Sequence, residues 1–481
     1  MIAAALFSKV ACSTASRAWN CVDRLKKEAI TTRMRTVICA LFLVALSAGA
    51  AVAKAVVTPT PQQIAEYEAA DEASRVKLLI MLAQTGQHEL AAVLLKSYPL
   101  TGNFAKNRTL FIEGLVLYGR GDLTGATKKY REALANDPSL TLVRAELAKT
   151  LSELGENESA KHHLELLMAE APNQAEAQGI RSFIDTIDAR RPYTFNAFIS
   201  VAPSTNVNNG STLDTVYTPN GDQIAIDQDS QKKSGIGFST GGSAGYAKRL
   251  GNDFSLVFGG NAIGTIYTDS TFNTYGSSET AELRYLLQGG HLGLGAVASQ
   301  SIESDISGFT YYSYGPRVSL QKDLTPKDRI NLSAVYEWRN DPKNSFNDGT
   351  ALLVDGSWNH ALSSSYVVSF SGGYDRVNYG LDYNSYNSYS AGFGVYKELT
   401  HGITADVRGK IARADFDEVF PFYGVVRKDM RYSGSIALTK RDFNIWGYAP
   451  AVEYDYVFND SNIASYHYNS QTVNFRLSKD F

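Results

Sequence analysis

The chain has 481 residues, of which 44% are hydrophobic and 20% are charged, and its formal net charge is −3. The sequence has 46 basic and 49 acidic residues. Seven of the basic and two of the acidic residues lie in the first 53 positions, so the rest of the chain carries a net charge of −8. This balance disfavours a nucleic-acid-binding surface. The length is sufficient for two or three domains, each with a core of its own.

The first 53 residues have the organisation of a secretory signal peptide. Arg33 and Arg35 precede an apolar run over 37–46, and small residues follow it as far as Ala53. We therefore expect residues 1–53 to be a signal peptide that is cleaved after Ala53, with Met34 as an alternative start to Met1. The run is shorter than the twenty or so residues that span a bilayer, which disfavours a retained membrane anchor.

Residues 54–189 are predicted to form a periplasmic, tetratricopeptide-like helical domain. Ala, Leu and Glu recur with helical periodicity from residue 61 onward. Three pairs of equivalent residues are 34 positions apart, which is the period of tetratricopeptide helix pairs. These pairs are Gly121 with Gly155, Ala126 with Ala160, and Pro138 with Pro172.

Short stacks of such helix pairs bind peptide segments in their concave groove, so this domain is a candidate substrate-binding element. A purely structural role, in which the stack only docks to the rest of the protein or to a neighbour, remains an alternative. His162 and His163 are adjacent on a predicted helix and point about 100° apart, so we expect solvated surface residues and no metal site. The candidate groove residues are Arg108, Tyr118, Leu142 and Lys149.

From residue 192 onward the sequence is rich in Gly, Ser, Asn and Tyr, and 24 of the 28 tyrosines lie there. Segments of alternating polarity are joined by connections that are short and long in turn, as in barrels with short periplasmic turns and long extracellular loops. The segments predict a fourteen-stranded antiparallel outer-membrane β-barrel over 192–481. Short connections are expected at 250–253, 288–291, 323–328, 361–365, 399–402 and 440–442, and long ones at 204–233, 269–278, 303–308, 341–349, 378–387, 415–423 and 459–464.

Each predicted strand has one polar and one apolar face, because successive side chains of a strand point to opposite sides. Turning the charged face toward lipid would cost about 2–4 kcal/mol per Arg or Lys at the midplane, so the charged face should line the lumen. Pro450 cannot donate a ladder hydrogen bond, and we expect a bulge or a local opening there. The candidate lumen residues are Arg339, Asp406, Arg408 and Arg476, and the candidate assembly signal comprises Phe475, Leu477 and Phe481.

No catalytic, metal or cofactor site is expected. The three cysteines, Cys12, Cys21 and Cys39, all precede the predicted cleavage site. The mature chain would therefore contain no disulfide, thiolate nucleophile or cysteine metal site. The histidines of the barrel region lack a neighbouring nucleophile motif, and the sequence contains no Walker-type nucleotide-binding motif.

Several stretches resemble the Slam family, the surface lipoprotein assembly modulators, which are outer-membrane translocons of the type XI secretion system. The resemblance covers roughly residues 60–481 and shares the order of signal peptide, helical repeats and fourteen-stranded barrel. The stretches that carry it are Ser204–Asn208, Tyr312–Leu320 around Gly315-Pro316-Arg317, and Gly447-Tyr448-Ala449-Pro450 continuing through Ser461-Asn462-Ile463 and Tyr466-His467-Tyr468 to Phe481.

The resemblance implies an outer-membrane translocon that moves surface lipoproteins, or secreted haem- or metal-acquisition proteins, from the periplasm to the cell surface. It implies as partners a protein substrate, periplasmic chaperones, the barrel-assembly machinery and outer-membrane lipid, and it implies no enzymatic activity. The alternative is an exopolysaccharide or small-solute porin with a helical-repeat scaffold. The product of a neighbouring gene would separate these two hypotheses.

Overall fold

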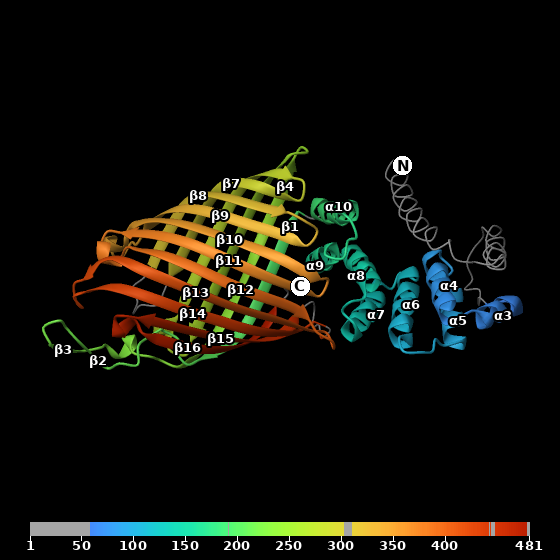
Figure 1. The fold of residues 1–481 in the computed structure, drawn as a ribbon, viewed down its shortest axis with the longest axis horizontal. Helices are drawn as coiled ribbons and strands as arrows, with labels where there is room; N and C mark the ends of the chain where they lie inside the picture. The colour runs from blue at the N-terminus through green and yellow to red at the C-terminus, as the bar shows by residue number, and fades with distance from the viewer. Residues whose placement is uncertain (1–57, 191, 303–309, 442, 444–447, 479–481) are drawn as a thin grey trace.

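A computed structural model describes residues 58–190, 192–302, 310–441, 443 and 448–478. The predicted signal peptide and the terminal Phe481 lie outside these residues. The described chain forms a row of helices followed by one closed barrel (Figure 1). Within the described residues, no helix is long and apolar enough to cross a membrane.

The helical domain is a stack of antiparallel helix pairs, as the 34-residue period predicts. Gly86, Gly121 and Gly155 each adopt a positive φ in the turn inside a pair, a conformation that glycine adopts without strain. Gly114 lets α6 approach α7 closely, because a Cβ at this position would lie 2.3 Å from a ring carbon of Tyr130. The helices are α3 (Pro61–Ala69), α4 (Glu72–Gln84), α5 (His88–Ser97), α6 (Ala105–Gly119), α7 (Leu123–Asn136), α8 (Thr141–Leu154), α9 (Asn157–Met168) and α10 (Gln174–Arg190).

Fourteen antiparallel strands close into the barrel, each paired with its neighbours in sequence, and β1 pairs with β16 to complete the ring. The short hairpin of β2 (Thr215–Tyr217) and β3 (Gln223–Ala225) lies in the first long loop. The barrel strands are β1 (Tyr193–Ser204), β4 (Gly235–Leu250), β5 (Phe254–Tyr267), β6 (Thr274–Leu287), β7 (Gly290–Ile302), β8 (Thr310–Asp323), β9 (Asp328–Asn340), β10 (Gly349–Ser363), β11 (Tyr366–Tyr379), β12 (Tyr386–Glu398), β13 (Ile403–Phe420), β14 (Val425–Lys440), β15 (Ala449–Ser461) and β16 (Tyr468–Ser478).

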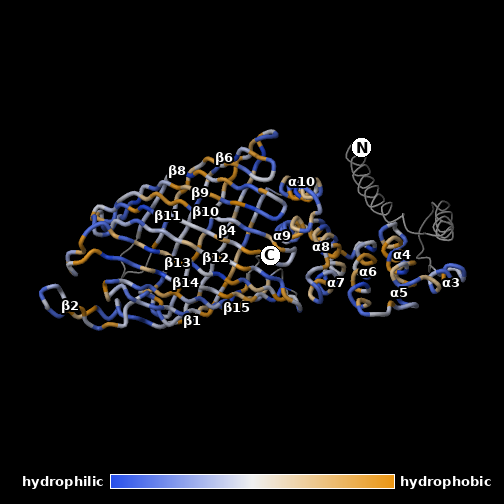
Figure 2. Tube along the Cα trace, in the orientation of Figure 1, coloured by the Kyte–Doolittle hydropathy of each residue, from blue (hydrophilic) through white to orange (hydrophobic). Residues whose placement is uncertain are grey.

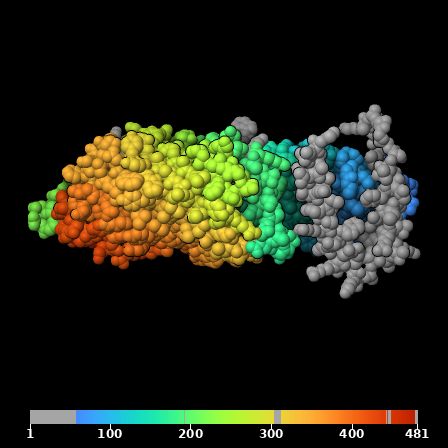
Figure 3. Space-filling model, turned by 90° about the horizontal axis from the view of Figure 1, so that it is seen from above, coloured from blue at the N-terminus to red at the C-terminus, as the bar shows by residue number. Residues whose placement is uncertain are grey.

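The strands are two-faced, and Figure 2 shows polar and apolar residues alternating along them. On β9, for example, Leu332, Tyr336 and Trp338 are 40–49% exposed on the outside, whereas Glu337 between them is 7% exposed on the inside. Polar side chains therefore face the lumen and apolar ones face outward. The turns after β4, β6, β8, β10 and β12 lie at the end of the barrel that faces the helical domain (Figure 1). Figure 3 shows the helical domain beyond this end of the barrel.

Several details of the predicted strands are wrong. β6 begins at Thr274, inside the connection expected at 269–278, and the short connection expected at 440–442 is longer, because β14 ends at Lys440 and β15 begins at Ala449. β13 and β14 extend to Phe420 and Val425, so most of the loop expected at 415–423 is strand, with a register irregularity between Asp415 and Val419. Strands of this length can extend beyond the part of the barrel whose outward face is apolar.

The local opening expected at Pro450 is found on the β14 side of the strand only, and there is no bulge on the β16 side. β15 begins at Ala449, and pairing of β15 with β14 begins one residue after the proline. Pro450 pairs with Leu477 of β16 without a register shift. Its missing N–H is accommodated because the first residues of a strand tolerate proline.

Candidate functional site

One face of α8 carries a mostly polar stripe, and side chains of α6 and α4 contact it. Leu142, Glu146, Lys149 and Glu153 are three or four residues apart, so they share this face. We call these four residues the α8 stripe. Glu146 accepts a hydrogen bond of 3.3 Å from Gln84 of α4, so the surface continues across three helices.

Tyr118 of α6 packs against the α8 stripe. Its hydroxyl donates to Glu153 at 2.6 Å, and the Nζ of Lys149 lies 4.3 Å from its ring centroid. Burial, and then the hydrogen bond to Glu153, raise the pKa of Tyr118 above its ordinary value, so the hydroxyl stays a neutral donor. The structure thus brings together Tyr118 and Lys149, two of the residues that the sequence singles out.

The other two candidates lie at the edges of this surface. Leu142, in the first turn of α8, is 54% exposed. Arg108 lies toward α4, where it forms an ion pair of 2.6 Å with Glu72, and its guanidinium carbon is 5.7 Å from the ring centroid of Phe104. Binding of a substrate by these residues stays a prediction.

The opposite face of α8 docks the helical domain onto the barrel. The side chain of Arg144 is fully buried, and its guanidinium forms an ion pair of 2.6 Å with Glu398 at the end of β12. Arg144 also donates to the carbonyl oxygen of Pro138 at 2.6 Å. A buried guanidinium needs such partners, because an unpaired charge in this position would be strongly destabilising.

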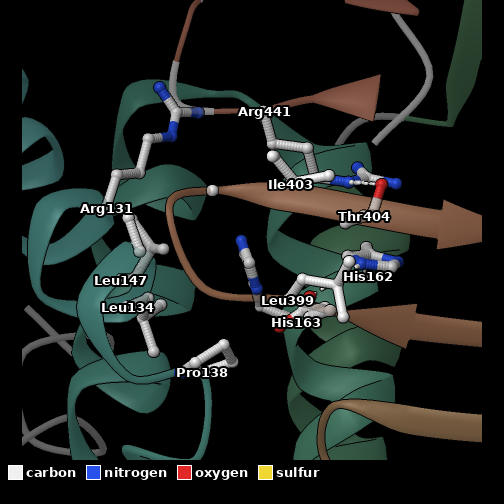
Figure 4. Close-up of a pocket in the computed structure, with 13 residues that line it drawn as sticks. Arg131, Leu134, Pro138, Leu147, His162, His163, Leu399, Ile403, Thr404 and Arg441 are labelled. Atoms are coloured by element: carbon white, nitrogen blue, oxygen red, sulfur yellow. Dashed lines mark hydrogen bonds and ion pairs between the residues drawn. The ribbon is translucent and has the colours of Figure 1, made fainter. Parts of the chain in front are cut away.

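His162 and His163 belong to the same junction, and the expectation that they are solvated surface residues is wrong. The Nδ1 of His163 lies 3.2 Å from Arg144, and the Nε2 of His162 lies 3.3 Å from the hydroxyl of Tyr396 and 3.8 Å from Glu398. Figure 4 shows both rings beside the turn between β12 and β13, around a cavity of about 60 Å³. The divergent directions of the two side chains let one reach Arg144 and the other reach Tyr396.

Further contacts tie the helical domain to successive turns of the barrel. Arg181 of α10 forms an ion pair with Asp323, and Glu165 of α9 pairs with Arg329 at 3.0 Å. Glu170 accepts a hydrogen bond of 2.8 Å from the backbone N–H of Ser364. These contacts reach the ends of β8 to β12, so they fix the helical domain to this part of the periplasmic mouth.

A larger cavity lies between α9, α10 and the ends of β4 to β9, next to the contacts of Glu165 and Arg181. It encloses about 970 Å³ and is lined by charged residues of both signs, with Glu158 and Asp188 on the helices and Arg284 and His291 on the barrel. Arg249 of β4 reaches across it to within 3.7 Å of Asp185. Its lining includes inward-facing residues of β5 and β6, such as Ser255 and Arg284.

The structure places the four candidate lumen residues on inward faces. Arg339 contacts Glu337 at 3.2 Å and the hydroxyl of Tyr379 at 3.3 Å. Asp406 and Arg408 form an ion pair of 2.7 Å, and the side chain of Arg408 is 68% exposed. The guanidinium carbon of Arg476 lies 4.8 Å from the ring centroid of Phe198. Each of these charged side chains lies next to a group of opposite charge or an aromatic ring. The lumen at these positions therefore does not carry charge of a single sign.

Of the candidate assembly residues, Phe475 is 55% exposed on the outside of β16 and pairs with Val201. Leu477 pairs with Ile199 on the same outward face. Their part in assembly stays a prediction.

The junction was not predicted from the sequence. Arg144 and Glu398 are 254 residues apart, and neither strongly interrupts the polar and apolar periodicity of the helix or strand in which it lies. The available signal was an arginine next to Val143 and one turn before Leu147, on a face of α8 that is otherwise buried.

Breaking the buried ion pair should release the helical domain from the barrel. An Arg144→Met change leaves Glu398 without its cation, and loss of one partner of a buried pair typically costs about 3–5 kcal/mol. We expect the purified variant to yield a free helical fragment much faster under proteinase K, while the barrel stays heat-modifiable. Arg120→Met, which removes an exposed pair with Glu89, is the control and should behave as the wild type. Equal release from Arg144→Met and wild type would contradict this account.

Acidification should weaken the same junction. Burial, followed by the nearby charge of Arg144, lowers the pKa of His163 well below its ordinary value, and burial lowers that of His162, although Glu398 opposes the shift. The docked state therefore binds fewer protons than the undocked state, so docking is favoured above the ordinary histidine pKa of about 6.5 and is lost as the pH falls below it. Arg131 and Arg441 add to the positive charge that a protonated ring would meet.

The measurement is proteinase K release of the helical domain at about pH 7.5 and about pH 5.5, on either side of the ordinary histidine pKa. We expect faster release at the lower pH, and a smaller difference in a His162→Gln, His163→Gln variant. A release rate that is the same at both pH values would refute the role of the histidines.

Comparison with known proteins gives two matches to family profiles. A profile described as surface lipoprotein assembly modifier matches residues 193–481, and a tetratricopeptide repeat profile matches residues 117–182. The first match covers the whole described barrel.

Curated relatives match most of the chain. Surface lipoprotein assembly modifier 1 of Haemophilus influenzae is 23% identical over 377 residues, covering 77% of this chain and 76% of the relative. Surface lipoprotein assembly modifier 2 of the same organism is 24% identical over 414 residues, covering 82% and 81%. A surface lipoprotein assembly modifier of Pasteurella multocida is 22% identical over 393 residues, covering 77% and 75%.

Proposed function

The chain belongs to the surface lipoprotein assembly modifier family, and we propose that it is a translocon that moves surface lipoproteins, or secreted haem- or metal-acquisition proteins, from the periplasm to the cell surface. The protein is an outer-membrane β-barrel with a role in surface lipoprotein assembly. Periplasmic chaperones that deliver the substrate, and the machinery that inserts the barrel, are further proposed partners. No catalytic step is part of this proposal.

The observation that carries the proposal is the position of the helical domain at the periplasmic mouth. It is anchored along the ends of β8 to β12, and a cavity of about 970 Å³ lies between it and the ends of β4 to β9. A domain placed in this way can hold a protein substrate next to an entrance without closing it. A scaffold unrelated to transport would have no need of an entrance beside the lumen.

The α8 helix links substrate binding to the barrel. Its stripe of Leu142, Glu146, Lys149 and Glu153 faces the neighbouring helices, and Arg144 on the other side is fixed to Glu398. A segment bound along the α8 stripe would therefore be held at a constant distance from the mouth. The stripe carries two acidic residues, one basic residue and one exposed leucine, which suits an extended peptide with mixed polar and apolar side chains.

The sequence has no Walker-type nucleotide-binding motif. Directional movement would then depend on events outside the cell, namely folding of the substrate, binding at the surface or insertion of its lipid.

Changes in the α8 surface test the proposed substrate contact. The double variant Tyr118→Ala, Lys149→Glu removes the ring that packs on the stripe and reverses the charge beside it. We expect several-fold less surface exposure of the lipoprotein encoded beside this gene, at unchanged barrel abundance, because groove binding depends on a few side chains. The measurement is protease shaving of intact cells.

The matched control is Lys129→Ala, which removes an ion pair of 2.7 Å between α7 and Glu113 of α6 without touching the stripe. It should leave surface exposure as in the wild type. Wild-type exposure in the double variant would show that this surface does not bind the substrate.

A further inference from the structure

The hairpin of β13 and β14 forms part of the lumen wall at the extracellular end of the barrel. Ile436 of β14 is exposed on the apolar outer face, so Val425 and Arg427, which lie an odd number of positions away, face inward. Phe420 is the pairing partner of Val425 across the hairpin and faces the same way. We call residues 419–425, at the tip of this hairpin, the ledge.

Aromatic rings gather on the inner side of the ledge. The ring centroid of Phe420 lies 4.9 Å from that of Tyr383 in the β11–β12 loop, 5.4 Å from that of Tyr423 and 6.2 Å from that of Tyr466 in the β15–β16 loop. The ledge also has exposed apolar side chains, namely Val419 (47%), Phe422 (36%) and Val425 (42%). It therefore presents an apolar surface at the extracellular mouth of the lumen.

Two arginines beside this surface are paired within the protein. The guanidinium carbon of Arg427 lies 3.5 Å from the ring centroid of Tyr466, and the guanidinium forms an ion pair of 2.6 Å with Asp429. Arg376 of β11 forms an ion pair of 2.6 Å with Asp417 at the base of the ledge. Because both guanidinium groups already bind a carboxylate, the surface suits an apolar partner better than an anionic one.

The β15–β16 loop braces the ledge. Asn462 accepts a hydrogen bond of 2.7 Å from the N–H of Lys428 and donates one of 2.8 Å to the carbonyl oxygen of Val426. This loop thus continues the contact with β14 past the end of β15. The hydroxyl groups of Tyr423 and Ser465 lie 2.6 Å apart and fix the turn of the hairpin to the same loop.

The first long loop also supports the ledge. Pro219, in the turn between β2 and β3, lies against Gly424, since a Cβ at Gly424 would lie 2.7 Å from the proline side chain. This loop is itself held to the β15–β16 loop, because the hydroxyl of Ser211 donates to the carbonyl oxygen of Ala464 at 3.2 Å. A surface that is held rigid in this way binds a partner with a smaller loss of conformational entropy.

We propose that the ledge binds an apolar segment of the substrate polypeptide as it leaves the lumen, and that this contact retains the emerging chain outside the cell. This inference rests on the proposed translocation of a protein. A segment that leaves the lumen before the substrate folds exposes apolar side chains to water, and burying them on the ledge is favourable. Folding of the substrate then buries the same side chains in its own core and frees the ledge.

An exported sugar polymer would also pass this surface, and aromatic rings can bind sugars. Two of the three exposed apolar side chains of the ledge are valines, and the arginines beside it are bound to Asp429 and Asp417. Branched aliphatic side chains offer no flat face on which a sugar ring can stack. The ledge therefore favours an apolar polypeptide segment.

Photo-crosslinking during export tests the contact directly. The photoreactive residue p-benzoylphenylalanine replaces Val425 on the ledge or, as a control, Phe346, which is 59% exposed in the connection between β9 and β10. We expect illumination of exporting cells to join position 425, and not position 346, to the lipoprotein encoded beside this gene. Absence of this adduct, equal adducts at both positions, or an adduct with a sugar polymer in place of the protein would overturn the proposal.

The variant Phe422→Ser, Val425→Ser tests whether the contact promotes export. Both side chains are exposed, so these changes should leave the amount of heat-modifiable barrel as in the wild type. We expect several-fold less surface exposure of the lipoprotein, measured by protease shaving. The matched variant Phe422→Leu, Val425→Ile keeps the surface apolar, and Phe346→Ser removes an exposed aromatic ring from another extracellular connection. Both of these controls should export the lipoprotein as the wild type does.

Wild-type exposure of the lipoprotein with the double serine variant would overturn the proposal, and so would an equal loss with either control. Failure of the proposed function has a different signature, because cells with the unmodified protein would then expose no more lipoprotein than cells that lack it.

Discussion

Cells that carry a chain lacking residues 61–189 should assemble a normal, heat-modifiable barrel and yet lose most surface exposure of the neighbouring lipoprotein. The barrel closes all of its strand ladders on itself, from β1 through β16, so it does not need the helices to satisfy its backbone. Glu398 and Asp323, freed from Arg144 and Arg181, would become solvated at the periplasmic mouth. The substrate would meanwhile lose the surface that holds it beside the cavity.

A porin would respond differently to this deletion. Uptake of a solute depends on the lumen, and it should stay the same or rise when the helical domain no longer covers part of the mouth. The measurement compares protease shaving of the lipoprotein with solute uptake in the same cells. Unchanged exposure of the lipoprotein would show that the helical domain is dispensable for export.

Replacing Phe475 and Leu477 with aspartate should leave little protein in the outer membrane. Both positions lie on the outward face of β16, opposite Val201 and Ile199. A lipid-facing Arg or Lys costs about 2–4 kcal/mol at the midplane of a barrel and an aspartate costs less, but a loss of about 1–2 kcal/mol already changes abundance several-fold. The two aspartates also disrupt the apolar face of β16, the last strand, which the assembly machinery is proposed to recognise.

The measurement is the amount of heat-modifiable protein in outer-membrane fractions. The control variant Phe475→Leu, Leu477→Val keeps the face apolar and should accumulate as the wild type does. Normal abundance of the double aspartate variant would contradict an outward position for these residues. The same reasoning predicts a loss on deletion of Phe481, a residue outside the described part of the chain.

The architecture could be predicted because it depends on local and periodic patterns in the sequence. Gly121 and Gly155 mark successive helix pairs because each adopts a positive φ in a turn. The fourteen strands follow from two-residue alternation and, except after β13 and β14, from the parity of the connection lengths. Both signals depend only on neighbours in sequence, and both predictions are confirmed.

The predictions that failed depend on tertiary placement. His162 and His163 are adjacent polar residues on a helix, a pattern that predicts solvent exposure. In the structure the barrel mouth covers them, and the residues near them in sequence do not indicate the contact with β12. The connection expected at 415–423 failed because β13 and β14 stay paired as far as Phe420 and Val425, although the outward face of β13 turns from apolar to charged at Arg413 and Asp415. The cavity beside α10 arises from the relative position of two domains and has no sequence signature.

The central claim is that this protein transfers a protein to the cell surface, and its most direct test is a comparison of three sets of cells. One set carries the full chain, one carries the chain without residues 61–189 and one carries neither, and all three produce the neighbouring lipoprotein in equal amounts. Protease shaving of intact cells should degrade the lipoprotein with the full chain and spare most of it in the other two sets. Equal degradation in all three sets would contradict the claim.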